Sequence, residues 1–155
     1  MQKGSLYHYI ASKNDLLFPL FNNAIDDVNA SLSSIAASDS PPDVKLKKAI
    51  QNHIQKQIEH FEEYCLYLQE RKFLPEVFEA EYSGKRKENE RLFSRIIQEG
   101  IDKGLFRKEI DCQITTLSIF GMLNWMTQWF KADGRVSAEK VGDLIYDLAI
   151  RGIRR

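Results

Sequence analysis

The sequence has no excess of charge of either sign, because 22 acidic side chains balance 22 basic ones among 155 residues. Binding to nucleic acid through phosphates requires a surface enriched in Lys and Arg. The first 42 residues hold only Lys3 and Lys13 against four aspartates. Bulk charge therefore does not indicate a nucleic-acid-binding protein. A basic DNA-binding surface, if the protein has one, is expected to lie mostly in a segment that this sequence does not contain.

Cysteine is scarce, and the motifs of most enzymes are missing. Cys65 and Cys112 lie within helical patterns and form no CxxC pair. We therefore expect buried, reduced thiols in a cytoplasmic protein. The sequence also lacks a glycine-rich phosphate loop and a nucleophile elbow. It has no pair of acids set in an apolar context. An enzyme is not favoured, and no cofactor is expected.

Two histidines raise the question of a metal site. His53 and His60 lie two helical turns apart on one flank of a predicted helix, near Glu59 and Glu63. Metal-binding helices typically place their ligands four residues apart, as in HExxH, and this sequence has no such pair. We expect ordinary hydrogen-bonded or exposed histidines and no metal.

No segment has the composition of a membrane span or a signal peptide. The uncharged stretch from residue 112 to 130 is long enough to span a bilayer, but it contains seven Gln, Asn, Ser and Thr residues. The N-terminus is polar and aromatic and lacks an apolar run. We expect neither membrane insertion nor secretion.

Apolar residues recur at three- and four-residue steps along the whole chain, which indicates amphipathic helices. The pattern predicts helices over residues 13–36, 43–62, 63–72, 75–103, 111–131 and 137–153. The stretch 37–42, which ends in two prolines, is predicted to be a linker. Gly104 is expected to end a helix, and Asp111 and Ser137 are expected to cap the next two. No strand pattern competes, so the predicted fold class is all-α.

The N-terminal stretch from residue 3 to 17 reads as a short helix, a tight turn and the capped start of a long helix. Ser12 and Asp15 have the spacing of a capping box. Leu6 and Ile10 share one face and are expected to point toward a core. The remaining face carries a cation, hydroxyl and aromatic polar groups without an acid. Such a face suits phosphate and base-edge contacts.

The run Lys-Gly-Ser-Leu-Tyr-His-Tyr-Ile-x-Ser-Lys-x-x-Leu-Leu closely resembles the end of the helix-turn-helix in TetR/AcrR-type transcriptional regulators. This resemblance implies a recognition-helix remnant at residues 1–11, a connecting helix at 12–36 and a ligand-binding and dimerisation domain at 37–155. In the family, two further helices precede the recognition helix, so we expect a chain truncated at its N-terminus. The implied phosphate contacts are Lys3, Tyr7, Tyr9 and Lys13, and the implied base-edge contacts are Gly4, Ser5 and His8.

The helix predicted at 111–131 is apolar on nearly every side, and the last helix has one continuous apolar stripe. A helix that is apolar all round must be covered on more than one flank. We expect these helices to form a four-helix bundle with a second copy of the chain; a wholly intramolecular core is the alternative. Residues 123–139 also resemble the dimerisation region of a TetR branch that regulates fatty-acid and sterol catabolism. The predicted interface comprises Leu117, Gly121, Trp129, Val141, Leu144, Ile145, Leu148 and Gly152.

The resemblance further implies an effector cavity among the middle helices. The aromatic and polar residues expected to line it are Phe61, Tyr64, Tyr67, Leu68, Phe93, Ile97, Phe120, Asn124, Trp125 and Gln128. Such side chains also fill ordinary cores. As a set they favour a largely apolar ligand with a polar end, such as an acyl-CoA. The implied function is a homodimeric, ligand-responsive repressor that its effector releases from operator DNA. The alternative is a dimeric effector-binding module without DNA-binding activity.

Overall fold

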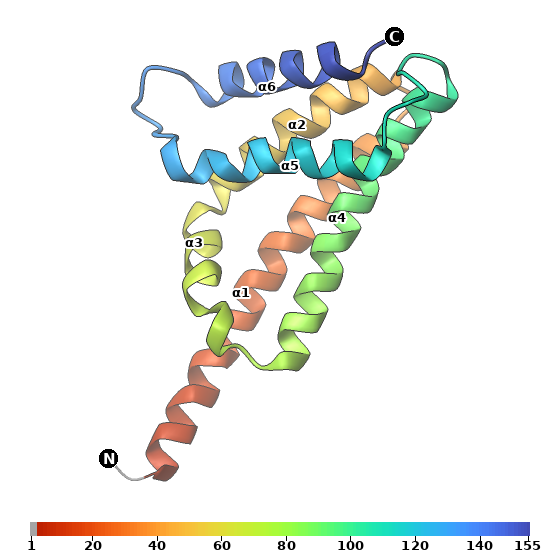
Figure 1. Cartoon of the computed structure of the whole chain (residues 1–155). Coiled ribbons are helices and arrows are strands. Elements are labelled where there is room, and N and C mark those ends of the chain that lie inside the picture. The colour runs from red at the N-terminus through yellow and green to blue at the C-terminus, as the bar shows by residue number, and fades with distance from the viewer. Residues whose placement is uncertain (1–2) are drawn as a thin grey trace.

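The computed structural model describes residues 3–155, and it confirms the all-α prediction for that part of the chain. Six α-helices follow one another along the chain, with one short 3-10 turn between the third and fourth. Figure 1 shows the long first and fourth α-helices running side by side, with the last two α-helices across one end of them. In chain order the elements are α1 (Lys3–Ala37), α2 (Pro42–Glu59), α3 (Phe61–Glu70), η1 (Arg71–Phe73), α4 (Glu76–Asp102), α5 (Cys112–Trp129) and α6 (Ala138–Ile153).

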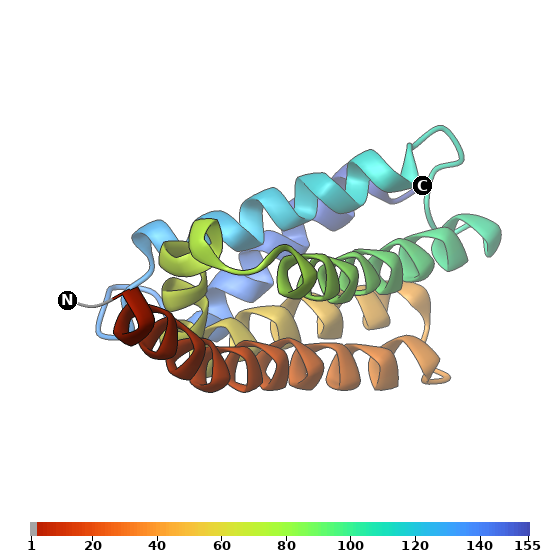
Figure 2. The same cartoon turned by 90° about the horizontal axis from the view of Figure 1, so that it is seen from below.

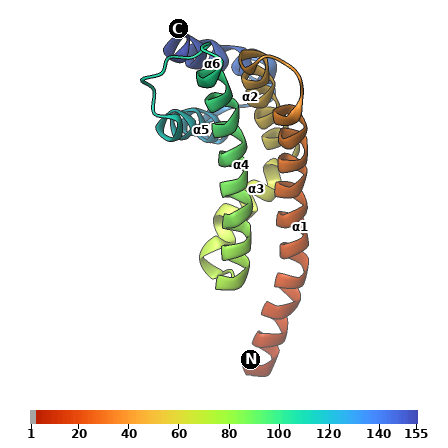
Figure 3. The ribbon, with the colours of Figure 1, turned by 90° about the vertical axis from the view of Figure 1, so that its right-hand side faces the viewer.

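Helix α1 is continuous, so the predicted turn at Ser12 is wrong. Ser12 and Asp15 lie inside the helix. A capping pattern is also compatible with a helix interior, and no neighbouring glycine or proline ends the helix at this point. The N-terminal part of α1 projects beyond the other helices (Figure 3), and in Figure 2, which is seen from below, it is the part nearest the viewer. Leu6 and Ile10 are exposed rather than core-facing, since no other described segment reaches that part of α1.

The predicted linker at 37–42 is confirmed, because α1 ends at Ala37 and α2 starts at Pro42. The buried Lys45 side chain of α2 links the end of α1 to α4. Its Nζ donates to the Ala36 carbonyl oxygen at 3.0 Å and to the Glu99 carboxylate at 2.9 Å. An ammonium group at the C-terminal end of α1 satisfies a free carbonyl and complements the negative end of the helix dipole.

The second helix was predicted to end at residue 62 and the third to begin at residue 63. In the structure, α2 ends at Glu59 and α3 begins at Phe61. Helix α4 follows Pro75 and runs unbroken through Ser83–Gly84. It ends at Asp102, one residue before the predicted end, and the predicted terminating residue Gly104 follows with a φ of +70°, which suits glycine. The chain then folds back, and the Phe106 ring packs so closely on Gly100 that a Cβ there would lie 2.2 Å from it.

Both predicted caps of the last two helices are confirmed. The Asp111 carboxylate accepts from the Ile114 N–H at 2.8 Å, and the Ser137 hydroxyl accepts from the Lys140 N–H at 3.3 Å. These bonds satisfy free N–H groups in the first turns of α5 and α6. In Figure 1, α5 and α6 lie across the end of the bundle that is remote from the N-terminus.

Two apolar clusters hold the helices together. The larger one joins residues of α1, α2, α4, α5 and α6, including the fully buried Leu46, Phe93 and Leu123. The smaller one joins α1, α3 and α4 through Phe21, Tyr67 and three further side chains. A gap that protein atoms do not fill separates the two clusters.

The two cysteines were expected to be buried, but both are half-buried. Cys65 and Cys112 are not joined by a disulfide, and burial raises the pKa of the Cys112 thiol. Within residues 3–155, no helix combines the length and apolar character that a membrane crossing requires.

Candidate functional site

A cavity of about 150 Å³ lies between the two apolar clusters, and its wall draws on five of the six α-helices. Helix α1 supplies one side, α2 and α3 a second, α4 a third, and α5 closes the end. The lining residues are Phe21, Ala24, Ile25, Val28, His53, Lys56, Gln57, His60, Glu63, Tyr64, Tyr82, Arg86, Asn89, Glu90, Phe120 and Asn124.

Aromatic rings from four helices form much of the wall. The ring of His53 meets that of Phe120 edge-on, with 5.2 Å between centroids, and lies 6.2 Å from that of Phe93. The rings of Phe93 and Phe120 are 4.9 Å apart in a similar arrangement. Edge-to-face packing of this kind fixes ring orientations. His53 is therefore part of a rigid, mostly apolar surface.

Burial makes His53 a neutral imidazole at physiological pH. Desolvation lowers its pKa from 6.5 to about 4, and a hydrogen bond with the Asn124 side chain opposes this only in part. The Nδ1 atom of His53 and the Oε1 atom of Gln57 are buried without a hydrogen-bond partner. A buried polar atom without a partner costs roughly 1–3 kcal/mol. The two residues lie one helical turn apart on α2 and both line the cavity.

A charged network lies at one edge of the cavity. The Lys56 ammonium is 2.8 Å from a carboxylate oxygen of Asp27 and 2.8 Å from one of Glu59. His60 Nε2 is 2.9 Å from the same Asp27 oxygen. A hydrogen bond from His60 lowers the pKa of the Asp27 carboxyl most, and a hydrogen bond from Lys56 lowers it further. The network joins α1 to the end of α2.

Asp27, Glu59 and His60 place ligand atoms within 4.8 Å of one another, as a metal site would. The set considered in the sequence, where no metal was expected, was a different one that paired His60 with His53. The structure instead places His53 in the aromatic wall and His60 beside Asp27. Because the Lys56 ammonium already bridges both carboxylates, a metal ion would have to displace a paired cation.

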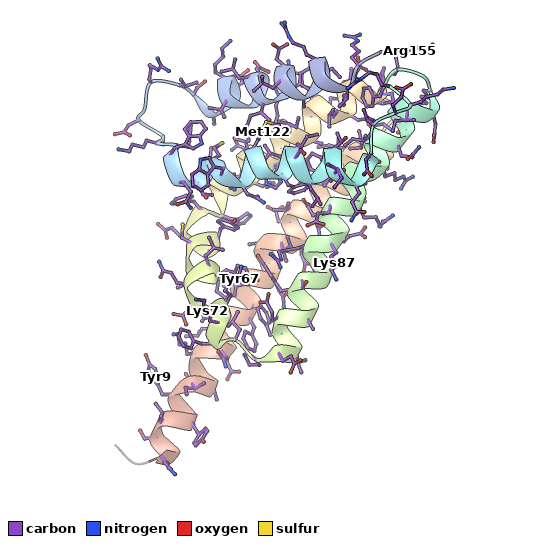
Figure 4. All side chains as sticks on the ribbon, viewed as in Figure 1. Tyr9, Tyr67, Lys72, Lys87, Met122 and Arg155 are labelled. Atoms are coloured by element: carbon purple, nitrogen blue, oxygen red, sulfur yellow. The ribbon has the colours of Figure 1, made fainter. Side chains whose placement is uncertain are left out.

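Three of the ten residues predicted to bind an effector line the cavity, namely Tyr64, Phe120 and Asn124. Phe93 lies directly behind Phe120 in the core. Tyr67 belongs to the smaller cluster, donates to Glu79 and lies among α1, α3 and α4 in Figure 4. The remaining five lie outside the lining: Ile97 is buried in the larger core, and Phe61, Leu68, Trp125 and Gln128 are exposed.

Sequence reasoning missed the contribution of α1 to the cavity. Phe21, Ala24, Ile25 and Val28 recur at helical spacing, which marked one buried face of α1. That spacing did not show that part of this face meets a cavity, because the opposing residues come from distant segments of the chain.

The predicted DNA contacts lie on the exposed N-terminal part of α1, where Figure 4 shows Tyr9. Most have no recorded partner side chain, but Lys13 does. Its ammonium lies 2.7 Å from the Glu70 carboxylate at the end of α3. The described residues of this predicted group are Lys3, Gly4, Ser5, Tyr7, His8, Tyr9 and Lys13, whereas residues 1 and 2 of the predicted remnant lie outside the described part.

The predicted dimer interface divides into exposed and buried residues. Val141 and Ile145 are buried within the chain's own core. Six others are exposed on α5 and α6: Leu117, Gly121, Trp129, Leu144, Leu148 and Gly152. Ile114 and Trp125 add to this surface, being 61% and 67% exposed. Gly121 and Gly152 have open space where a Cβ would stand. We call the exposed members together the α5/α6 apolar face.

Comparison with known proteins places this architecture in a family. Residues 39–153 match the family described as "Tetracyclin repressor-like, C-terminal domain". The chain is 27% identical over 152 residues to the HTH-type transcriptional repressor KstR2 of Mycolicibacterium smegmatis, covering 97% of this chain and 74% of that protein. It is 23% identical over 153 residues to KstR2 of Mycobacterium tuberculosis H37Rv, covering 98% and 76%.

Solved structures show the same architecture. The TetR family regulator PfmR from Thermus thermophilus superimposes with a TM-score of 0.84 at 28% identity, covering all of this chain and 84% of that one. AibR, solved in complex with isovaleryl coenzyme A and operator DNA, superimposes with a TM-score of 0.76 at 25% identity, covering 96% and 80%. The chain therefore belongs to the TetR family of transcriptional regulators, and residues 39–153 form its tetracycline-repressor-like C-terminal domain.

Proposed function

We propose that the chain is a homodimeric repressor that leaves its operator DNA when a small, largely apolar effector fills the cavity. The observation that carries this proposal is the position of α1. Four residues in the middle of α1 line the cavity, and the N-terminal end of the same helix carries the predicted DNA contacts. A ligand that moves the cavity-lining part of α1 also moves its N-terminal part.

The length of α1 amplifies such a movement. Tyr7 precedes Phe21 by 14 residues, which corresponds to ~21 Å of helix at 1.5 Å per residue. A tilt of about 10° at Phe21 then displaces Tyr7 by ~4 Å. In a symmetric dimer the two displacements add, and recognition helices must stay ~34–36 Å apart to reach successive major grooves. A change of several ångströms is therefore enough to weaken operator binding.

Dimerisation is supported by the α5/α6 apolar face. Exposed leucine and tryptophan side chains lie on two neighbouring helices, whereas monomeric proteins rarely expose large apolar patches. The glycines at positions 121 and 152 let a second helix approach closely. Pairing of this face with its own copy would form a four-helix bundle.

The cavity limits the effector to a compact apolar group. A volume of about 150 Å³ matches a six-membered ring or a short branched acyl chain, but not a long acyl chain. If the effector is an acyl-CoA, only its acyl end fits inside. AibR is described in complex with isovaleryl coenzyme A, a thioester with a short branched acyl group, and that agreement supports this size class.

Isovaleryl coenzyme A is therefore the first probe, with isothermal titration calorimetry of the whole chain as the assay. We expect binding to the wild type and loss of binding in Val28→Phe, which fills the cavity from α1. Val77→Phe is the matched control, because Val77 is 83% exposed at the start of α4. Unchanged binding by Val28→Phe would exclude the cavity as the binding site.

A dimeric module without DNA-binding activity is the second candidate, favoured by the pairing of Lys13 with Glu70 instead of a free basic surface. Salt dependence separates the two functions. A regulator that contacts phosphates binds operator DNA with an affinity that falls steeply as salt increases. A sensing module alone shows no such binding.

A further inference from the structure

The cavity wall contains two polar atoms that nothing in the described part of the chain satisfies. They are Nδ1 of His53 and Oε1 of Gln57, on consecutive turns of α2. Both residues line the cavity, and the imidazole packs edge-on against the rings of Phe93 and Phe120. Polar groups of this kind in an otherwise apolar pocket typically fix a ligand's orientation.

We infer that the effector carries an uncharged O–H or N–H donor, a hydroxyl or an amide, beside its compact apolar body, and that His53 and Gln57 accept from it. This inference rests on the proposed effector cavity and adds the chemistry of its ligand. The two atoms are closed off from solvent in the structure. A ligand therefore has to displace neighbouring side chains to reach them, while the imidazole ring keeps its packing on Phe93 and Phe120.

Both atoms act as acceptors. A neutral imidazole has one N–H and one lone-pair nitrogen. The tautomer that carries its proton on Nε2 leaves the lone pair on Nδ1. That tautomer is part of the inference, since it lets the buried, unpaired Nδ1 accept. Gln57 Oε1 is an acceptor by nature. A ligand group with donors complements both.

Charge in the wall argues against an anionic group. Two cationic residues, Lys56 and Arg86, face two acidic ones, Glu63 and Glu90, so the lining has no net charge. Lys56 is already held by two carboxylates. A carboxylate ligand beside neutral His53 would gain no new ion pair from Lys56, and burying it there would carry a large desolvation cost.

Three six-membered-ring probes test this chemistry in the whole chain by NMR titration. Cyclohexanol supplies a donor, methoxycyclohexane an acceptor without a donor, and cyclohexanecarboxylate an anion. We expect cyclohexanol to bind at least about tenfold more tightly than the other two, since an unpaired acceptor disfavours a ligand that lacks a donor. We also expect cyclohexanol to shift the His53 Nδ1 resonance.

Replacing Gln57 separates recognition from folding. In Gln57→Met, cyclohexanol affinity should fall about tenfold, toward that of the ether, while the ether binds as before. The melting temperature should not fall, because the substitution removes an unpaired buried group. Gln55→Met, on the exposed side of the same helix, should leave both affinities unchanged.

The outcomes distinguish this inference from the proposed function. Equal affinities for cyclohexanol and the ether, or tightest binding of the carboxylate, would overturn the donor chemistry and leave the cavity as a ligand site. A His53 resonance that does not move at saturating cyclohexanol would also overturn it. If no probe binds at all, both the donor chemistry and the proposed effector cavity fail.

Discussion

Replacing Leu148 by lysine tests the proposed dimer. Leu148 is 67% exposed on α6, in the α5/α6 apolar face. Fully burying a leucine side chain is worth about 1.5–3 kcal/mol, so burying the exposed two thirds contributes ~1–2 kcal/mol for each protomer. A two-fold interface contains the residue twice, which gives ~2–4 kcal/mol and a roughly 30- to 1000-fold increase in the dimer dissociation constant. Burial of the lysine charge adds to this loss.

Sedimentation equilibrium measures the effect directly. Wild type at micromolar concentration should sediment as a dimer of about 36 kDa, twice the chain mass of 18.0 kDa. Leu148→Lys should sediment as a monomer with unchanged helical circular dichroism. Val77→Lys is the control, since Val77 is more exposed but lies away from this face. A monomeric wild type, or a Leu148→Lys variant that dimerises as strongly as wild type, would refute the reasoning.

Two further predictions concern stability. Lys45→Met removes two charge-assisted hydrogen bonds at the end of α1. The free energy of unfolding should fall by ~2–3 kcal/mol and the melting temperature by roughly 4–12 °C. An unchanged melting temperature would contradict that role. Because the pKa of His53 is about 4 when folded and 6.5 when unfolded, the unfolded chain binds the extra proton and stability falls as pH decreases through this window. Between pH 7.5 and 5 the loss from His53 is about 2 kcal/mol, measured by urea unfolding of wild type against His53→Gln. Equal pH slopes in the two proteins would show that His53 is not buried neutral.

Local signals in the sequence predicted most of the fold. Asp111 and Ser137 were identified as caps because a cap depends on residues within three positions of it. Gly104 was identified as a helix end for a similar reason. The turn predicted at Ser12 was wrong, since its capping pattern is equally compatible with a helix interior.

The cavity could be predicted only in part, because its wall is assembled from distant segments. Tyr64 and Phe120 were predicted as lining residues from their aromatic character. The same criterion also selected Trp125, which is exposed, and passed over Val28, which lines the cavity. Which face of a helix meets a gap depends on how that helix packs against segments far away in sequence. Periodicity within one helix does not contain that information.

A distance between the two α1 helices of a dimer tests the central claim most directly. Tyr9→Cys, in a background with Cys65 and Cys112 replaced by serine, carries one spin label on the projecting end of α1. Pulsed electron paramagnetic resonance should show a defined distance between the protomers, because the labels couple only in a dimer. That distance should change by several ångströms when cyclohexanol saturates the cavity, as judged by the NMR titration. No coupling at a protein concentration where sedimentation finds the dimer, or an identical distance with the cavity filled, would contradict the account.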